Sequence, residues 1–435
     1  MVACRRGYVV TVFQPKERVV GWMLVVVLLA GVSGCKDQHQ LGLEQAHGKD
    51  RGGVDARVAV ESHAHPRHRA RVRGRRRTCA PSWRPRRTFC TVPGPRLRVD
   101  KSFRLDGERG VMSRTPLLHG GRLFEIFLYD RKDWTESRLM CFDSQTLELQ
   151  WERVEAQALG NVVVNVDGDL LLLTMTGPVQ VICLDPAAGA PTWTWRREDE
   201  GAGMLSDDAD GRVLVTGVAE ERTTWCLDSR TGAELWSFSN GDHPYTPSVH
   251  EGRLFLSTKR TLNALDMASG LLLWSSSEPT TYLFTPVVVA GLVVISGHGL
   301  INAYDSDDGE LRAQLTTGQP RDAVYGVAVA EDTVCFGDSA GFVYCWTVTA
   351  GPEAGLAERW RYASAGAVSG TPAVVNDRLY VANGAKKLLA LDMGTGELLA
   401  QVGIRAAPRE AGVVVDEDGN LYVAAERNLL KVVAV

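Results

Sequence analysis

Short apolar runs of four to six residues, bounded by Gly, Asn and Asp, follow one another along the last three-quarters of the chain. Between residues 371 and 400, four such runs are separated by three turns, and the first turn is Asn376–Asp377. Apolar runs of this length between turn residues are typical of short antiparallel strands. The pattern therefore predicts a unit of four strands that recurs along the chain.

One polar phrase marks the third turn of these units. It consists of an aspartate, a glycine four residues later and often a tryptophan four residues after that. The copies are Asp185, Gly189 and Trp193; Asp228, Gly232 and Trp236; Asp266, Gly270 and Trp274; Asp305 and Gly309; Asp392 and Gly396; and Asp143 with Trp151. From Asp143 to Asp305 the aspartates are 42, 43, 38 and 39 residues apart, a period typical of a repeat architecture.

We interpret the three residues of the phrase as structural. The aspartate side chain can accept backbone N–H groups in the turn, and the glycine can close the turn with a positive φ. The tryptophan, early on the fourth strand, can fill the wedge between neighbouring units. Each member is missing from some copy. Leu147 replaces the glycine, Thr347 the aspartate, and Ala313 and Ala400 the tryptophan. This tolerance favours packing over chemistry.

The repeat also shows how many units the chain contains. Seven units have their third strand, including the degenerate copy at Thr347. An eighth, at residues 412–435, lacks its fourth strand, and residues 97–105 can supply it. Pairing the two chain ends in one unit would remove an exposed edge from each. We predict an all-β, eight-bladed β-propeller of four-stranded antiparallel blades over residues 97–435, closed by an N-terminal strand in the last blade. Seven blades is the alternative.

The N-terminus has the pattern of a secretory signal. A basic region precedes an apolar stretch at residues 19–34, which ends in small residues. This stretch is shorter than the roughly 20 residues that a bilayer span needs. Val32 to Cys35 resembles a bacterial lipobox, in which the cysteine is diacylated and becomes the mature N-terminus. We predict a lipoprotein signal peptide at residues 1–35 and lipidation of Cys35. An uncleaved anchor, an ordinary signal peptide or a wrong start codon are the alternatives.

The next segment differs from the rest of the chain. Residues 51–98 contain fourteen Arg, no Lys and two acidic residues, about +12 in a chain whose net charge is −4. We interpret residues 36–96 as an Arg- and Pro-rich disordered linker, because such a charge run cannot collapse. A second interpretation is a contact arm for anionic lipid headgroups or nucleic acid. A third is a frame-shifted reading of a GC-rich gene.

Four cysteines share one position of the repeat. Cys141, Cys183, Cys226 and Cys345 lie two residues before the aspartate position, where other copies have Ala. We expect free, buried, structural thiols, because equivalent positions on adjacent blades are too far apart for a disulfide.

Other candidate chemistry is weak. Asp305, Asp307 and Asp308 resemble the start of a calcium loop, but Thr316 stands where an EF-hand has Glu. The sequence has no Cys-x-x-Cys pair, nucleophile elbow, phosphate loop or dinucleotide fingerprint. We therefore predict no metal site, no cofactor and no catalytic residue.

Residues 388–397, together with the tryptophan of other copies, resemble the pyrroloquinoline-quinone-type propeller repeat, and the resemblance covers about residues 97–435. Two classes share this repeat. The quinoprotein dehydrogenases hold the quinone with calcium, an Asp, a stacking Trp and often a disulfide between adjacent cysteines; this chain has no such pair and no long insertions. The second class is the lipid-anchored, eight-bladed scaffold family of the bacterial β-barrel assembly machine, which implies a periplasmic lipoprotein that docks on the barrel-inserting subunit.

The favoured prediction is a non-enzymatic scaffold in the bacterial cell envelope. It would bind other envelope proteins through loops on the ring. The lipid on Cys35 would anchor it to a membrane, and we expect the periplasmic face of the outer membrane. We expect no nucleic-acid partner, and the oligomeric state stays open. A quinone-dependent dehydrogenase or another small-ligand-binding propeller is the alternative.

Overall fold

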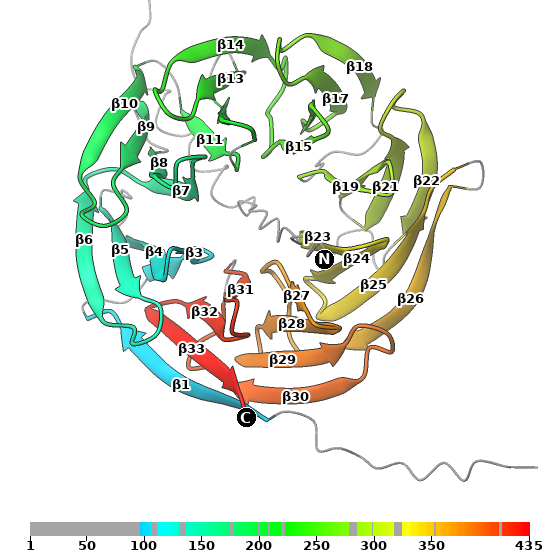
Figure 1. Cartoon of the computed structure of the whole chain (residues 1–435). Helices are drawn as coiled ribbons and strands as arrows, with labels where there is room; N and C mark the ends of the chain where they lie inside the picture. The colour runs from blue at the N-terminus through cyan, green and yellow to red at the C-terminus, as the bar shows by residue number, and fades with distance from the viewer. Residues whose placement is uncertain are drawn as a thin grey trace, which may run out of the picture. The chain divides into compact units, whose positions relative to one another are not determined.

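The computed structural model describes residues 96–106, 111–129, 136–174, 178–198, 201–207, 209–218, 222–277, 285–297, 299–316, 324–351, 354–408 and 411–435. These residues belong to one compact unit. Within them the chain forms 33 strands and no helix. The strands build eight antiparallel sheets arranged as the blades of a ring (Figure 1). The predicted eight-bladed β-propeller is therefore confirmed.

The first four blades follow in chain order. Blade 1 contains β2 (Val111–Ser113), β3 (Leu117–His119), β4 (Arg122–Tyr129), β5 (Ser137–Asp143) and β6 (Leu149–Glu155). Blade 2 contains β7 (Leu159–Val164), β8 (Leu170–Thr174), β9 (Val179–Leu184) and β10 (Pro191–Arg197). Blade 3 contains β11 (Ala202–Leu205), β12 (Arg212–Gly217), β13 (Thr223–Asp228) and β14 (Glu234–Ser239). Blade 4 contains β15 (Ser248–His250), β16 (Arg253–Ser257), β17 (Thr261–Asp266) and β18 (Leu272–Ser277).

The other four blades complete the ring. Blade 5 contains β19 (Val287–Val289), β20 (Leu292–Ser296), β21 (Leu300–Asp305) and β22 (Leu311–Thr316). Blade 6 contains β23 (Val324–Ala330), β24 (Thr333–Asp338), β25 (Phe342–Thr349) and β26 (Gly355–Ala363). Blade 7 contains β27 (Ala373–Val375), β28 (Arg378–Asn383), β29 (Lys387–Asp392) and β30 (Leu398–Gly403). Blade 8 contains β31 (Val413–Val415), β32 (Leu421–Ala425), β33 (Asn428–Ala434) and β1 (Leu97–Arg104).

Blade 8 joins the two ends of the described chain. Strand β1 pairs antiparallel with β33, from Leu97 opposite Ala434 to Arg104 opposite Asn428. Two backbone hydrogen bonds between Arg96 and Val435, at 2.9 and 2.7 Å, extend the pairing. The predicted closure by an N-terminal strand is confirmed, and Figure 1 shows β1 along the outside of β33.

Each blade packs against both of its neighbours, so the core lies between blades. On β16, Leu254 packs in a cluster with Leu214 and Cys226 of blade 3. The next residue, Phe255, packs in a cluster with Val293 and Tyr304 of blade 5. Because both faces of the middle strands are buried, they are continuously apolar rather than alternating. This explains the uninterrupted apolar runs in the sequence.

Candidate interaction surface

The repeat turns lie on one face of the ring, because the first and third turns of an antiparallel four-stranded blade fall at the same end. Backbone hydrogen bonds join them within a blade, for example from Met267 N to Gly252 O at 2.9 Å and from Met393 N to Asp377 O at 3.0 Å. We call this side, formed by the first and third turns of the blades, the turn face. The two turns of a blade are therefore held together by hydrogen bonds and are not independent loops.

The repeat aspartates are used inside these turns. Asp143 Oδ1 accepts the backbone N–H groups of Gln145 at 2.9 Å and Thr146 at 2.8 Å. The Thr146 N–H, with smaller contributions from its hydroxyl and from Gln145, holds the pKa of Asp143 below its usual value. Hydrogen bonds from the Thr231 and Ser269 hydroxyls have the same effect on the pKa of Asp228 and Asp266. The same two contacts occur at Asp185 and Asp392, and Asp305 Oδ1 accepts the N–H of Asp307 at 2.9 Å.

The repeat glycines have two tasks. Their φ lies between 65° and 74° at Gly189, Gly232, Gly270, Gly309 and Gly396. Each also contacts the indole of the preceding blade. A Cβ added to Gly309 would lie 2.5 Å from Cε3 of Trp274. A side chain at this position would therefore collide with the tryptophan, a constraint that the turn alone does not impose.

The tryptophans also form hydrogen bonds with the neighbouring blade. Trp274 Nε1 donates to Ser306 O at 3.1 Å, and Trp236 Nε1 donates to Met267 O at 3.0 Å. In each case the acceptor directly follows the repeat aspartate of the next blade. Each described copy also has a β-bulge on its outer strand. The residue directly before the tryptophan position has no partner on the neighbouring strand. Indole, glycine and capped turn thus form one joint between blades.

Sequence reasoning missed one of these joints. Trp360 packs on Gly396 and donates to Met393 O at 2.9 Å. Blade 6 has a longer third turn, so Trp360 lies thirteen residues after Thr347 instead of eight. The signal that identifies it is cross-strand register, because Cys345 pairs with Trp360 as Cys141 pairs with Trp151.

Between blades 5 and 6 a different aromatic residue fills the wedge. Ala313 occupies the tryptophan position, and Trp346 of blade 6 packs in the same cluster as Ala313. Trp346 is fully buried, and its ring meets Phe336 edge-on at 5.0 Å between centroids. An indole from the opposite blade therefore replaces the missing one.

At the joint between blades 8 and 1, polar contacts take the place of the indole. Lys431 Nζ donates to Gln145 Oε1 at 2.6 Å, and the Tyr422 hydroxyl donates to Ser144 O at 2.8 Å. Lys101 stands opposite Lys431, in the register position that holds a tryptophan elsewhere. Since no indole presses on this turn, Leu147 can replace the glycine, with φ at 56°.

The cysteine prediction was wrong at one position. Cys345 forms a disulfide with Cys335, its directly opposite residue on β24, with the two Cα atoms 4.3 Å apart. The prediction compared positions on adjacent blades, whereas the partner lies one strand away in the same blade. Cys141, Cys183 and Cys226 are free and buried. Burial raises the pKa of Cys141 and Cys226 to about 12, which keeps both thiols protonated.

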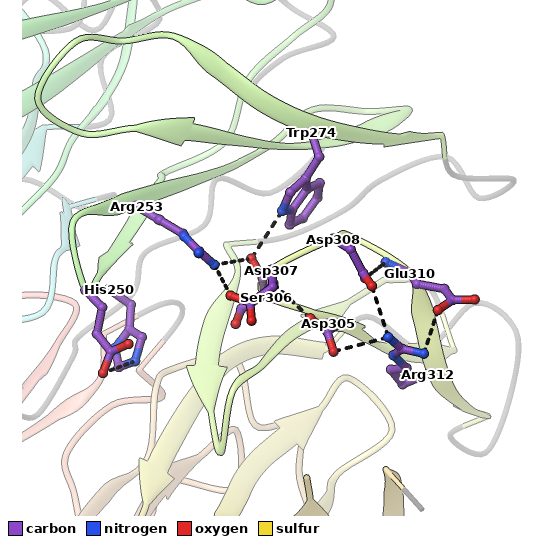
Figure 2. A network of polar contacts seen from close by, with 10 residues as sticks. His250, Arg253, Trp274, Asp305, Ser306, Asp307, Asp308, Glu310 and Arg312 are labelled. Atoms are coloured by element: carbon purple, nitrogen blue, oxygen red, sulfur yellow. Dashed lines mark hydrogen bonds and ion pairs between the residues drawn. The ribbon is translucent and has the colours of Figure 1, made fainter. Parts of the chain in front are cut away.

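A charged network covers the turns of blades 4 and 5 (Figure 2). Arg253 Nη1 donates to Ser306 O at 2.9 Å and forms an ion pair with Asp307. Arg312 forms ion pairs with the three other carboxylates of the blade 5 turn, Asp305 at 3.3 Å, Asp308 at 3.1 Å and Glu310 at 2.5 Å. The sequence that resembled a calcium loop is thus arranged around two guanidinium groups.

Beside this network, Asp305, Leu311, Arg312, Gly351 and Ala354 line a cleft of about 450 Å³. No group of three His, Cys, Asp or Glu side chains in the described part of the chain is placed to hold a metal ion. Nor do the residues with assigned positions include a helix of the length and hydropathy of a membrane span. Cys35, the predicted signal peptide and the predicted linker up to residue 95 lie outside the described residues.

Two of three comparisons with known proteins find matches. The family model described as "Outer membrane protein assembly factor BamB" matches four overlapping segments, residues 135–244, 179–357, 298–404 and 355–435. A comparison with curated proteins gives no match. Together the four segments span more than half of the chain.

Solved structures share the fold. The crystal structure of BamB from Moraxella catarrhalis is 16% identical with a TM-score of 0.56, over 77% of this chain and 97% of that one. Sqt1 from Saccharomyces cerevisiae is 13% identical with a TM-score of 0.60, over 79% and 99%. A europium-containing methanol dehydrogenase is 11% identical with a TM-score of 0.56, over 78% and 93%. At these identities the likeness concerns the propeller alone.

Proposed function

Because the chain belongs to the family of the outer membrane protein assembly factor BamB, we propose that it is a non-enzymatic scaffold of the bacterial cell envelope. It is anchored to the outer membrane by a lipid on Cys35, binds envelope proteins through its exposed turns and edges, and takes part in the assembly of outer-membrane β-barrel proteins.

The observation that carries this proposal is the use of the repeat residues. The carboxylates cap their own turns, and all but one of the repeat indoles, Trp193 being the exception, donate to the next blade. The residues that could have formed a repeated site therefore hold the ring together. What the ring offers to other molecules is a rigid display of turns and strand edges, which suits partner recognition.

The disulfide supports a location outside the cytoplasm. Disulfides persist in oxidising compartments such as the bacterial periplasm and are rare in the cytosol. The bond between Cys335 and Cys345 fits an exported protein, as do the signal pattern and the lipobox that end at Cys35.

The test begins with the anchor. The full-length chain is expressed in a bacterium with wild-type sequence, with Cys35→Ala and with the matched control Cys4→Ala, and is labelled with palmitate. We expect label and detergent-phase partitioning in the wild type and in Cys4→Ala, and loss of both in Cys35→Ala. Label retained by Cys35→Ala would refute lipidation at this residue.

The second step tests the assembly role. Membranes carrying the anchored protein are treated with a cleavable cross-linker, and the captured proteins are identified by mass spectrometry. We expect the barrel-inserting subunit of the assembly machine. Recovery of the ring alone would count against the assembly role. Stoichiometric binding of added pyrroloquinoline quinone and calcium, with turnover of an alcohol, would overturn the non-enzymatic role.

A further inference from the structure

The outer edge of blade 4 is unusually bare. Strand β18 reads Leu-Leu-Trp-Ser-Ser-Ser and contains no charged residue. Leu271, Leu272 and Leu273 are 68%, 49% and 50% exposed. Leu273 is the bulged residue of this strand, because Ala264 pairs with Trp274 whereas Leu265 pairs with Leu272. Three consecutive leucines therefore face solvent at the edge of a sheet.

Most other outer strands of the ring are protected. Proteins place charged side chains on sheet edges because an unpaired strand is a template for another chain. Ion pairs lie on β6 (Arg153 with Glu155), on β1 (Arg98 with Asp100) and on β26 (Arg361 with Glu358).

The four further edges, β10, β14, β22 and β30, carry or contact a charged residue of the same blade or of its neighbour. Arg197 of β10 pairs with Glu234 of β14, and Arg312 lies on β22. Strand β30 has no charged residue of its own, but Lys387 of β29 donates to Gln401 on it at 2.8 Å. Among the residues that the structure describes, no charged side chain contacts β18 in this way, and Ser275 on it donates to the neutral Asn263 of β17 at 2.7 Å.

The backbone of β18 is open on its outer side. Within the described residues it pairs with β17 and with no other strand. An edge of this kind can accept an extended peptide, with main-chain hydrogen bonds supplying affinity and side-chain alternation supplying specificity. The leucines would give the apolar contact that such a strand needs.

The surroundings favour a basic partner. In the neighbouring turn of blade 5 the side chains of Asp307, Asp308 and Glu310 are 78%, 55% and 66% exposed. With Asp305 they place four carboxylates beside the two guanidinium groups of Arg253 and Arg312, so two negative charges are not balanced within this network. Trp274 fixes this turn beside β18 through its bond to Ser306. Outside residues 51–98 the chain carries about −16, so pairing of this edge with the propeller of a second copy would be opposed by repulsion.

We propose that β18 binds an extended segment of a partner protein that alternates apolar side chains and carries Lys or Arg at the end near Asp308 and Glu310, adding a fifth strand to blade 4. The proposal rests on the function proposed above, that this chain is a protein-binding scaffold, and it specifies the edge and the chemistry. Leu272 lies at the turn face, so the basic end of the partner lies at that face too.

The probe is a fluorescein-labelled synthetic peptide of ten residues, with alternating Val and Thr and two Lys at one end. Binding is followed by fluorescence anisotropy with the full-length protein in detergent. The test variant is Leu272→Lys with Ser275→Lys. The matched control is Leu398→Lys with Gln401→Lys, which places two lysines at the same register on β30. All four positions are exposed, and a melting curve for each variant checks folding.

We expect at least tenfold weaker binding for the β18 variant and less than twofold change for the β30 variant. The same peptide with alternate amides N-methylated along one edge should lose binding at least tenfold. Equal losses in both variants, or equal binding of the methylated peptide, would overturn strand addition at β18. So would a peptide that does not bind the wild type, or a wild-type dimer that the β18 variant abolishes. The assay needs neither the anchor nor the assembly machine, so its failure is distinguishable from failure of the proposed function.

Discussion

The joint between blades 4 and 5 allows the role of the repeat glycine to be measured. Gly309 has a φ of 72°, and a Cβ at this position would lie 2.5 Å from Cε3 of Trp274. Gly291, in the first turn of the same blade, has a φ of 75° and nothing within 4 Å of its Cβ position. Substitution of each by Ala imposes the same backbone penalty, and only the first disturbs the indole.

The magnitudes differ accordingly. An L-residue at positive φ costs about 1 kcal/mol, and this is the whole cost that we expect for Gly291→Ala. Gly309→Ala must also displace the indole of Trp274, which would lose its bond to Ser306 O, worth about 1 kcal/mol, and part of its packing. We therefore expect Gly309→Ala to lower the free energy of unfolding by about 3 kcal/mol.

Urea unfolding followed by tryptophan fluorescence measures both changes, and a double-mutant cycle identifies their cause. In a Trp274→Ala background the collision partner is gone, so Gly309→Ala should cost no more than Gly291→Ala. Equal destabilisation by Gly309→Ala and Gly291→Ala in the wild type would refute the joint, and so would strict additivity of Trp274→Ala with Gly309→Ala.

Three further predictions concern a buried carboxyl group, the disulfide and the closing strand. Burial raises the pKa of Glu125 well above its usual value, against the opposing N–H and charge of Arg114, so the folded state favours the protonated acid. The protonated Glu125 contributes its full stability below the pKa of Glu in the unfolded chain, and this contribution is lost as pH rises through the pKa of Glu125 in the folded state. Melting temperatures measured from pH 4 to 9 should therefore fall more in the wild type than in Glu125→Gln. Parallel curves of melting temperature against pH for the two proteins would contradict this prediction. Replacing Cys335 and Cys345 together by Ala should lower the free energy of unfolding by about 2–3 kcal/mol in non-reducing buffer; no change would mean that the bond is absent. Deleting residues 1–104 removes β1 and should leave a chain that binds a hydrophobic dye and aggregates, whereas a cooperative melt at the wild-type temperature would show that closure is dispensable.

The number of blades was predictable because each blade repeats the same local pattern. The aspartate and glycine of one turn act within six residues, so their spacing is visible in the chain. The missing fourth strand of blade 8 was predictable for the same reason, since a unit that stops early needs a strand from elsewhere. The contact between β1 and β33 confirms that reasoning.

The joints between blades were harder to predict from the sequence because they depend on residues in different units. The requirement for glycine at position 309 comes from its contact with Trp274, which lies 35 residues earlier in the chain, and the sequence of the turn does not show this contact. Trp360 was missed because a longer turn changes its spacing but not its cross-strand register. The disulfide was missed because Cys335 occupies a position that holds Phe124 and Phe255 in other blades, so the repeat pattern predicts a large apolar residue there. The bare edge of blade 4 appears only when all eight outer strands are aligned.

The positions of the joints bear on the binding proposal. Blade 4 is held on both sides by indole joints, Trp236 against Gly270 and Trp274 against Gly309, and Arg253 adds a third link to blade 5. The joints that lack the contact between a repeat tryptophan and a repeat glycine lie between blades 5 and 6 and on either side of blade 8. A strand that adds to β18 therefore meets an edge whose position is already fixed, and it loses little affinity to ordering the scaffold. The same contacts that make the repeat phrase unsuitable for catalysis make blade 4 suitable as a docking edge.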